Sequence, residues 1–159
     1  MSKKYKVYSG GNILNQKTIS LISYLRGDSR EKLTAISKKT GIPISTLFDL
    51  LKELQDDVIT RCTVLLDFHK LGFHTRSQLF LKIKSENQEK ILNFLSNQNC
   101  INSIYKTNNG WNLIAETVHK NNKELDSFIE QLHEKCSIDD HKIHYLIDDI
   151  QKENFLINP

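Results

Sequence analysis

Four side chains in the last third of the chain could bind a metal ion. His133 and Cys136 lie one helical turn apart, and His141 and His144 follow a few residues later. Imidazole nitrogen and thiolate sulfur are ligands that suit Zn²⁺. No Cys-x-x-Cys pair accompanies them, however, and an i, i+3 spacing arises easily by chance. His141 and His144 would share a face if a turn separated them and would lie on opposite faces of one strand. We therefore expect no metal site and no other cofactor.

The sequence motifs of common enzyme classes are absent. There is no G-x-S-x-G, no P-loop, no G-x-G-x-x-G and no H-E-x-x-H. We therefore expect a protein that is not an enzyme.

Cysteine usage and hydropathy point to the cytoplasm. The three cysteines, Cys62, Cys100 and Cys136, do not make a disulfide framework. The first residues carry cations but no apolar signal core, and no apolar run approaches the roughly 20 residues of a membrane span. We expect a cytoplasmic protein without a membrane partner.

The positive charge is concentrated in the first third of the chain. The 159 residues hold 22 Lys and Arg against 19 Asp and Glu, a net charge of +3. Residues 1–60 hold ten Lys and Arg against six Asp and Glu, whereas residues 61–159 hold twelve against thirteen. This distribution predicts a basic module that contacts a polyanion, attached to a near-neutral one.

Three short helices are predicted after a basic arm. Residues 1–14 lack periodicity and carry Lys3, Lys4 and Lys6. Apolar spacing predicts one helix from Lys17, ending at Gly27, and a second over Lys32–Thr40. Gly41 supplies a turn, and a third helix runs over Ile44–Asp56. Two helices joined by a short turn with glycine are typical of a helix-turn-helix, whose last helix enters the DNA major groove.

A strand is predicted directly after this helical block. Cys62–Asp67 is apolar and β-branched, and it predicts a winged variant of the helix-turn-helix. Arg61 is the cation best placed to add a backbone contact from the wing.

The rest of the chain predicts the order β-α-β-β-α-β. The expected strands are Leu79–Ile83, Ile101–Thr107, Trp111–Val118 and an alternating run through Ile143, Tyr145, Ile147 and Ile150; the expected helices are Gln88–Asn97 and one marked by Leu125, Phe128, Ile129 and Leu132. Asn108-Asn109-Gly110 is a strong hairpin signal. This is the ferredoxin-like split βαβ motif, and the fold class is α+β. Its uncovered sheet face predicts a self-complementary dimer.

The order of these parts resembles the leucine-responsive/AsnC (Lrp/AsnC) family of prokaryotic transcription regulators. The resemblance covers roughly Asn15 to Ile150, and it is carried by Val58-Ile59, by Leu66-Asp67 with Leu71-Gly72, and by the strands around Trp111. It implies a flexible basic arm (1–14), a winged helix-turn-helix DNA-binding domain (15–61), a hinge (62–73) and a ferredoxin-like, ligand-sensing RAM domain for oligomerisation (74–159). It also implies binding of palindromic double-stranded DNA as a homodimer or higher oligomer, modulated by an amino-acid-like effector.

The candidate DNA-binding residues surround the third helix. They are Arg30, Lys32, Lys38, Lys39, Ser45, Thr46, Lys52 and Arg61. Ser45 and Thr46 would alternatively cap the third helix, and Phe48 is expected half-buried against the wing. Lys38 and Lys39 are either solvated helix-end charges or phosphate contacts.

The resemblance places the effector at the turn between the second and third strands. Its candidate residues are Asn109, Gly110, Trp111 and Asn112, where the family commonly has Gly-x-Tyr/Phe-Asp. Trp111 is expected in the core or at the dimer interface, with a ligand wall as the alternative.

Two other functions remain open. The span from Ser45 to Asp57 holds one Lys against four acidic residues, which favours an effector-sensing or protein-interaction module that has lost specific DNA reading. The same architecture also occurs in haem-precursor decarboxylases, although no cationic, histidine-bearing porphyrin pocket is indicated.

Overall fold

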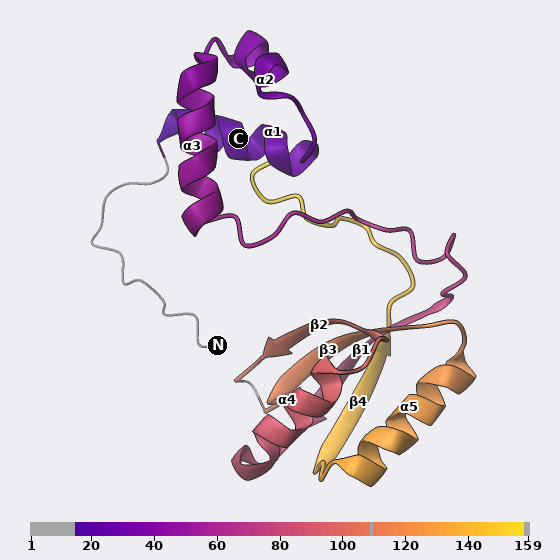
Figure 1. The fold of residues 1–159 in the computed structure, drawn as a ribbon. Helices are drawn as coiled ribbons and strands as arrows, with labels where there is room; N and C mark the ends of the chain where they lie inside the picture. Colours follow the sequence, from indigo (N-terminus) through magenta and orange to yellow (C-terminus); the bar gives the residue numbers. More distant parts are fainter. Residues whose placement is uncertain (1–14, 109, 158–159) are drawn as a thin grey trace. The chain divides into compact units, whose positions relative to one another are not determined.

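The chain folds into two compact units in the computed structural model (Figure 1). Residues 15–108 and 110–157 are described, so the predicted arm and the candidate residue Asn109 lie outside the described residues. One unit contains the chain up to Val64 together with the segment from Gln151, and the other contains Leu65–Ile150. No helix of the described residues is long and apolar enough to cross a membrane.

The first unit contains the three predicted helices. They are α1 (Gln16–Gly27), α2 (Leu33–Thr40) and α3 (Ile44–Asp57), each within a residue of its expected bounds. Asn15 caps α1, because its side chain accepts a hydrogen bond from the Thr18 amide (2.9 Å). The core of this unit consists of Leu21, Ile36, Ile42, Leu47 and Leu54. The apolar periodicity therefore predicted the three helices.

The predicted wing strand is not formed. Residues 58–74 contain no strand among the described residues, and Cys62–Asp67 run through the linker without a ladder. Val64, Leu65 and Leu66 are about half exposed or more. A β-branched, apolar run becomes a strand only when a neighbouring strand accepts its backbone hydrogen bonds. No described residue provides that neighbour, so the expectation of a wing was wrong for this chain.

The second unit is built on a four-stranded antiparallel sheet. Its strands are β1 (Thr75–Lys82), β2 (Ile101–Lys106), β3 (Leu113–His119) and β4 (Asp140–Tyr145), in the order β2-β3-β1-β4. In the register, Leu79 of β1 lies opposite Ala115 of β3 and Ile143 of β4. β1 is thus a central strand, paired along both sides.

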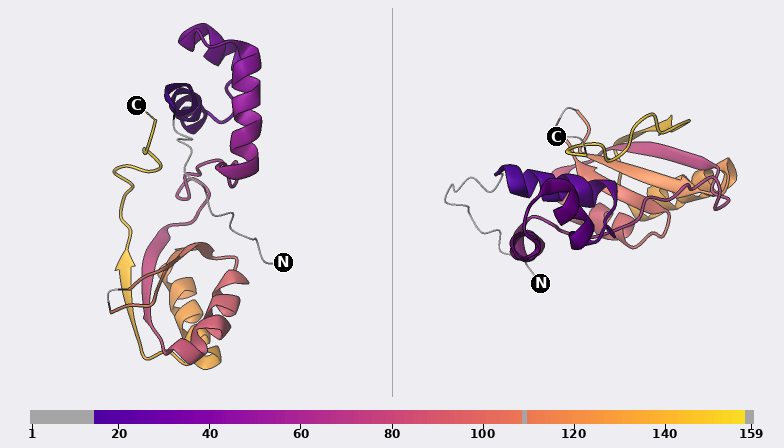
Figure 2. Two further views of the ribbon diagram at one scale, coloured as in Figure 1. Left: turned by 90° about the vertical axis from the view of Figure 1, so that its left-hand side faces the viewer. Right: turned by 90° about the horizontal axis from the view of Figure 1, so that it is seen from above.

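Both helices of this unit cover the same face of the sheet (Figure 2). A single turn of 3₁₀ helix, Ser85–Asn87, leads into α4 (Gln88–Ser96), and α5 is Asn122–Lys135. The core between helices and sheet consists of Leu79, Leu81, Ile83, Ile91, Leu95, Leu113, Ala115, Leu125, Phe128, Leu132 and Cys136. The predicted ferredoxin-like order is confirmed, and so is the α+β class.

Two strand boundaries differ most from the prediction. β1 begins at Thr75, four residues before the expected start, because Ser77 and Thr117 are polar residues on the buried face. Their hydroxyls satisfy each other in a hydrogen bond of 2.8 Å. β4 ends at Tyr145, and Ile147 and Ile150 beyond it are almost fully exposed. Their alternation with Ile143 and Tyr145 was therefore misleading.

The C-terminal segment packs on α1 and not on the sheet. Ser23 Oγ of α1 donates a hydrogen bond to the Ile157 carbonyl (2.6 Å). Arg26 Nη2 donates to the Glu153 carbonyl (2.8 Å) and forms an ion pair with its carboxylate (3.0 Å). The expected domain 74–159 therefore loses its last nine residues to the first unit. No periodic pattern in residues 151–157 could have predicted this contact.

Removal of this segment should loosen α1. A chain that ends at Ile150 loses the contacts to Ser23 and Arg26, which together stabilise the first unit by about 1–2 kcal/mol. We expect roughly 5- to 30-fold faster amide exchange in α1, measured by hydrogen–deuterium exchange, with β1 and β3 unchanged. Phe155→Ser, at a side chain that is 77% exposed, is the matched control. Unchanged protection of α1 in the truncated chain would contradict the assigned contact.

Candidate functional site

The turn between α2 and α3 sets where α3 begins. Gly41 adopts a left-handed backbone with φ 72°, which strains any residue with a side chain. Ser37 Oγ donates a hydrogen bond to the Ile42 carbonyl (2.6 Å), and the Ile42 side chain is buried. The turn is therefore fixed from both its backbone and its side chains, as a helix-turn-helix requires.

The first turn of α3 presents free hydroxyl groups. Pro43 is the N-cap residue, and α3 has no side-chain cap. Ser45 is exposed and Thr46 is half-buried, and neither hydroxyl has a hydrogen-bond partner among the described residues. The alternative role of these two residues as helix caps is therefore excluded. Their hydroxyls and the free N–H groups of the first turn can instead bond an outside acceptor.

Exposed cations lie on and just before α2. Arg30, Lys32 and Lys38 are exposed, and their side chains have no ion-pair partner among the described residues. Lys39 differs, because its ammonium forms an ion pair with Glu31 and lies 5.1 Å from the centre of the Tyr24 ring. The hydrogen bond to Glu31 raises the pKa of Lys39 above its ordinary value. Lys39 must therefore leave Glu31 before it can pair with a phosphate.

The exposed side of α3 carries both signs of charge. Lys52 is exposed, and so are Asp49 and Glu53 beside it. Phe48 is 59% exposed, so the expected packing against a wing was wrong. Arg61 is exposed in the linker and belongs to no wing. The cations of α2 and the N-terminal end of α3 thus form the most coherent polar surface of this unit.

The candidate effector turn borders a cavity of about 380 Å³. Gly110 adopts φ 80°, which closes the turn between β2 and β3. Asn112 Oδ1 accepts a hydrogen bond from the buried Ile83 amide (2.7 Å), so this side chain holds the end of β1. Lys82, Lys84, Ser85 and Asp139 also line the cavity. The structure therefore brings Gly110, Trp111 and Asn112 together at one hollow.

Trp111 is half-buried on the sheet face that the helices leave uncovered. Its ring meets the Phe80 ring edge-on, with 6.0 Å between centroids. Phe80 also packs against His144, with 5.0 Å between centroids. Trp111 therefore joins an aromatic cluster at the sheet surface and does not belong to the main core.

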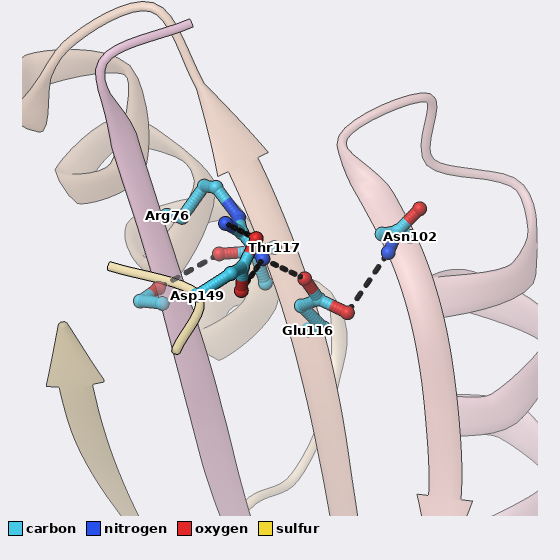
Figure 3. A network of polar contacts seen from close by, with 6 residues as sticks. Arg76, Asn102, Glu116, Thr117 and Asp149 are labelled. Carbon is cyan, nitrogen blue, oxygen red and sulfur yellow. Dashed lines mark hydrogen bonds and ion pairs between the residues drawn. The ribbon is translucent and has the colours of Figure 1, made fainter. Parts of the chain in front are cut away.

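A charged network was missed at sequence level. The Arg76 guanidinium binds the carboxylates of Glu116 (2.9 Å) and Asp149 (2.7 Å), and Asn102 donates to Glu116 (2.8 Å; Figure 3). These carboxylates raise the pKa of Arg76. The network ties the segment after β4 to the sheet. Arg76 escaped prediction because it precedes the expected start of its strand.

The fold brings two of the four possible metal ligands together, with His133 Nε2 and His141 Nδ1 3.0 Å apart, and separates Cys136 and His144 from them. Cys136 is buried in the core, where burial raises the pKa of its thiol. His141 and His144 both lie in β4 and therefore on opposite faces. Across the described chain, no group of three or more His, Cys, Asp or Glu could hold a metal ion.

Comparisons with known proteins identify relatives among helix-turn-helix regulators. No family model matches the chain. The HTH-type transcriptional regulator FL11 of Pyrococcus furiosus is 26% identical over 121 residues, which cover 76% of this chain and 80% of FL11. FL11 of Pyrococcus horikoshii is also 26% identical, over 69% of this chain and 74% of that protein.

Solved structures share the fold over most of the chain. The transcriptional regulator NMB0573 of Neisseria meningitidis, solved with L-Met, has a TM-score of 0.81 at 13% identity and covers 87% of this chain and 93% of its own. LrpC of B. subtilis has a TM-score of 0.79 at 16% identity, with 87% and 97% covered. E. coli AsnC has a TM-score of 0.76 at 15% identity, with 91% and 97% covered.

The fold and the exposed first turn of α3 define the class of helix-turn-helix proteins with a ferredoxin-like second domain. Within that class, the predicted resemblance to the leucine-responsive/AsnC family is confirmed in fold by these neighbours. The curated relatives of this chain are HTH-type transcriptional regulators.

Substitution of Asn112 tests the structural role of its side chain in the candidate effector turn. Asn112→Ala should lower the free energy of unfolding by about 1–2 kcal/mol, because the buried Ile83 amide loses its acceptor. Asn112→Asp keeps an acceptor oxygen and should stay near the wild-type value. Denaturant unfolding of the full chain measures both. Equal stability of Asn112→Ala and the wild type would show that Asn112 does not support β1.

Proposed function

We propose that this chain is a DNA-binding transcription regulator of the leucine-responsive/AsnC type. It binds palindromic operator DNA as a dimer or higher oligomer and responds to a small, amino-acid-like effector. The single observation that carries the proposal is the uncapped first turn of α3 next to exposed cations. The HTH-type regulators among its relatives support the same function.

DNA attachment rests mainly on phosphate contacts. Arg30, Lys32 and Lys38 carry exposed, unpaired cations in the described unit and can replace the counterions of DNA. Ser45 and Thr46 can reach bases or phosphates from the N-terminal end of α3, where recognition helices contact base edges. Further along α3, the carboxylates of Asp49 and Glu53 repel the phosphate backbone of DNA. Base reading is therefore confined to the first turn of the helix.

Dimer formation rests on the uncovered face of the sheet. Tyr105, Ile114 and Phe80 form one row across β2, β3 and β1, and Val118 lies on the same face. Tyr105 is 56% exposed, and tyrosine is a residue type that is enriched at protein interfaces. A second copy that applies the same face would bury this row and create the twofold axis that a palindrome requires.

The effector cavity has the charges that a free amino acid needs. Lys82 and Lys84 lie on its rim and can bind a carboxylate, and Asp139 can bind an ammonium group. A neighbour in fold, NMB0573, was solved with L-Met. Asn112 replaces the family's aspartate with a neutral amide, so Asp139 becomes the candidate anion of the cavity.

A second function has one observation in its favour. The exposed face of α3 carries Asp49 and Glu53 against Lys52 alone in its middle turns. Such a helix suits a basic protein partner better than a phosphate backbone. A chain that keeps the fold but has lost specific DNA reading would sense its effector and act through that partner.

The salt dependence of DNA binding tests the main function. The double variant Arg30→Gln/Lys38→Gln should bind DNA more weakly, and the slope of log K against log salt should become shallower by about 0.9 for each lost phosphate contact. Fluorescence anisotropy with a labelled duplex of random sequence at several salt concentrations measures both quantities.

The control for this assay is Lys123→Gln, at an exposed lysine of α5 in the other unit. It should bind DNA as the wild type does. An absence of salt-sensitive binding by the wild type would refute DNA binding. Binding that appears only in Asp49→Lys/Glu53→Lys would favour the protein-interaction function.

The dimer surface is tested by introducing one charge into it. Phe80→Glu places a carboxylate in the centre of the proposed interface, and an unpaired charge there should weaken the dimer roughly tenfold or more. Light scattering at micromolar concentration measures the mass, and circular dichroism checks the fold. Lys123→Glu, on the helical side of the unit, is the control and should leave the dimer intact. A wild-type monomer, or a Phe80→Glu dimer of full strength, would contradict this interface.

A further inference from the structure

Two histidine rings meet at the surface of the sheet unit, where the end of α5 approaches the start of β4. His133 lies in the last turn of α5, and His141 lies near the start of β4. The His133 Nε2 and His141 Nδ1 atoms are 3.0 Å apart. The ring centroids are 4.8 Å apart, with 67° between the planes. The two nitrogens share a hydrogen bond, so two ligand-type atoms lie next to each other at the surface.

The position of each ring is fixed by its element. α5 is anchored on the sheet by Leu132, next to His133 in the chain, and Leu132 is 1% exposed. Ile143 packs against the same core, so His141, two residues earlier in β4, also points to the helix-covered face. The His141 amide bonds Asp140 Oδ1 (2.8 Å), which secures the beginning of the strand. The two elements that carry the pair are thus anchored by packing on the core.

The nitrogen spacing is that of two ligands in adjacent coordination positions. With metal–nitrogen bonds of about 2.0–2.1 Å, nitrogens 3.0 Å apart subtend an angle of roughly 90–95° at the metal. This is the angle between neighbouring ligands in square-planar and octahedral complexes, the geometries of Cu²⁺ and Ni²⁺. A tetrahedral Zn²⁺ site would need a separation of only about 0.3 Å more.

We propose that His133 and His141 form a surface site for a late first-row divalent cation such as Ni²⁺, Cu²⁺ or Zn²⁺. Both rings bind as neutral imidazoles whose proton is on the other ring nitrogen, so the ion replaces the hydrogen bond between His133 Nε2 and His141 Nδ1. Water completes the coordination, because the described residues offer no third His, Cys, Asp or Glu at this point. The ion cross-links the end of α5 to β4 and thereby stabilises the sheet unit.

Cys136 and His144, the other two candidate metal ligands in the sequence, take no part in this site. The Cys136 side chain is 4% exposed and packs with Leu125 and Phe128 in the core. The His144 ring lies on the opposite face of β4, against Phe80. The chain has a second histidine pair, His69 and His74, whose rings pack edge to face at 4.3 Å between centroids. The experiment must therefore distinguish metal binding at His69 and His74 from metal binding at the proposed site.

Titration of the full chain with Ni²⁺ alone, followed by isothermal calorimetry, tests the proposal. We expect a site of one ion per chain in the wild type, and binding roughly tenfold weaker or more in His133→Gln and in His141→Gln, because each loses half of the chelate. The ion should also raise the thermal midpoint of the wild type and leave that of either variant unchanged. Both rings lie at the surface, so circular dichroism should show folded variants.

His144→Gln and the double variant His69→Gln/His74→Gln are the matched controls, and both should keep the site. A wild type that binds no ion at millimolar Ni²⁺ would overturn the proposal. Unchanged affinity in His133→Gln and His141→Gln would do the same. Loss of the site only in His69→Gln/His74→Gln would move it to the second pair and would equally refute the assignment.

Discussion

The alternation of side chains along β1 is the constraint on which the sheet unit depends. Leu79 and Leu81 point to the helices and are fully buried, whereas Arg76 and Phe80 point to the other face. Because β1 is paired on both sides, this alternation sets the faces of β3 and β4 as well. A shift by one residue would expose the core and bury the charged network. The register of one strand therefore determines which face of the sheet is available to a partner.

The uncovered face links the sheet unit to the proposed DNA binding. A dimer through a single self-complementary face has a twofold axis, and it carries two copies of α3. Two recognition helices related by a twofold axis read a palindrome, and each contributes only the first turn that the α2–α3 connection positions. In the proposed complex, the cations before and on α2 supply affinity, and Ser45 and Thr46 supply the base contacts. The acidic middle turns of α3 are compatible with this arrangement, because it assigns them no contact with DNA.

The sequence predicted those parts of the structure that depend on local periodicity. Helices α1 to α5 follow apolar residues at helical spacing, and the hairpin between β2 and β3 follows Asn108 and Gly110. The errors arose where a distant partner decides. Thr75 and Ser77 belong to β1 only because Thr117 lies opposite Ser77, and Cys62–Asp67 is not a strand because no described strand lies beside it. The contact of Ser23 with Ile157 and the meeting of His133 with His141 are likewise products of tertiary folding.

Selection of bound sequences from a random duplex library would test whether this chain reads palindromic DNA as a dimer. A dimer that reads a palindrome should enrich a motif with two inverted half-sites, centred about one helical turn or a multiple of it apart. The enriched positions should be few in each half-site, because only the first turn of α3 is free of acidic residues. A motif without inverted symmetry, or no enrichment over the starting library, would contradict the account.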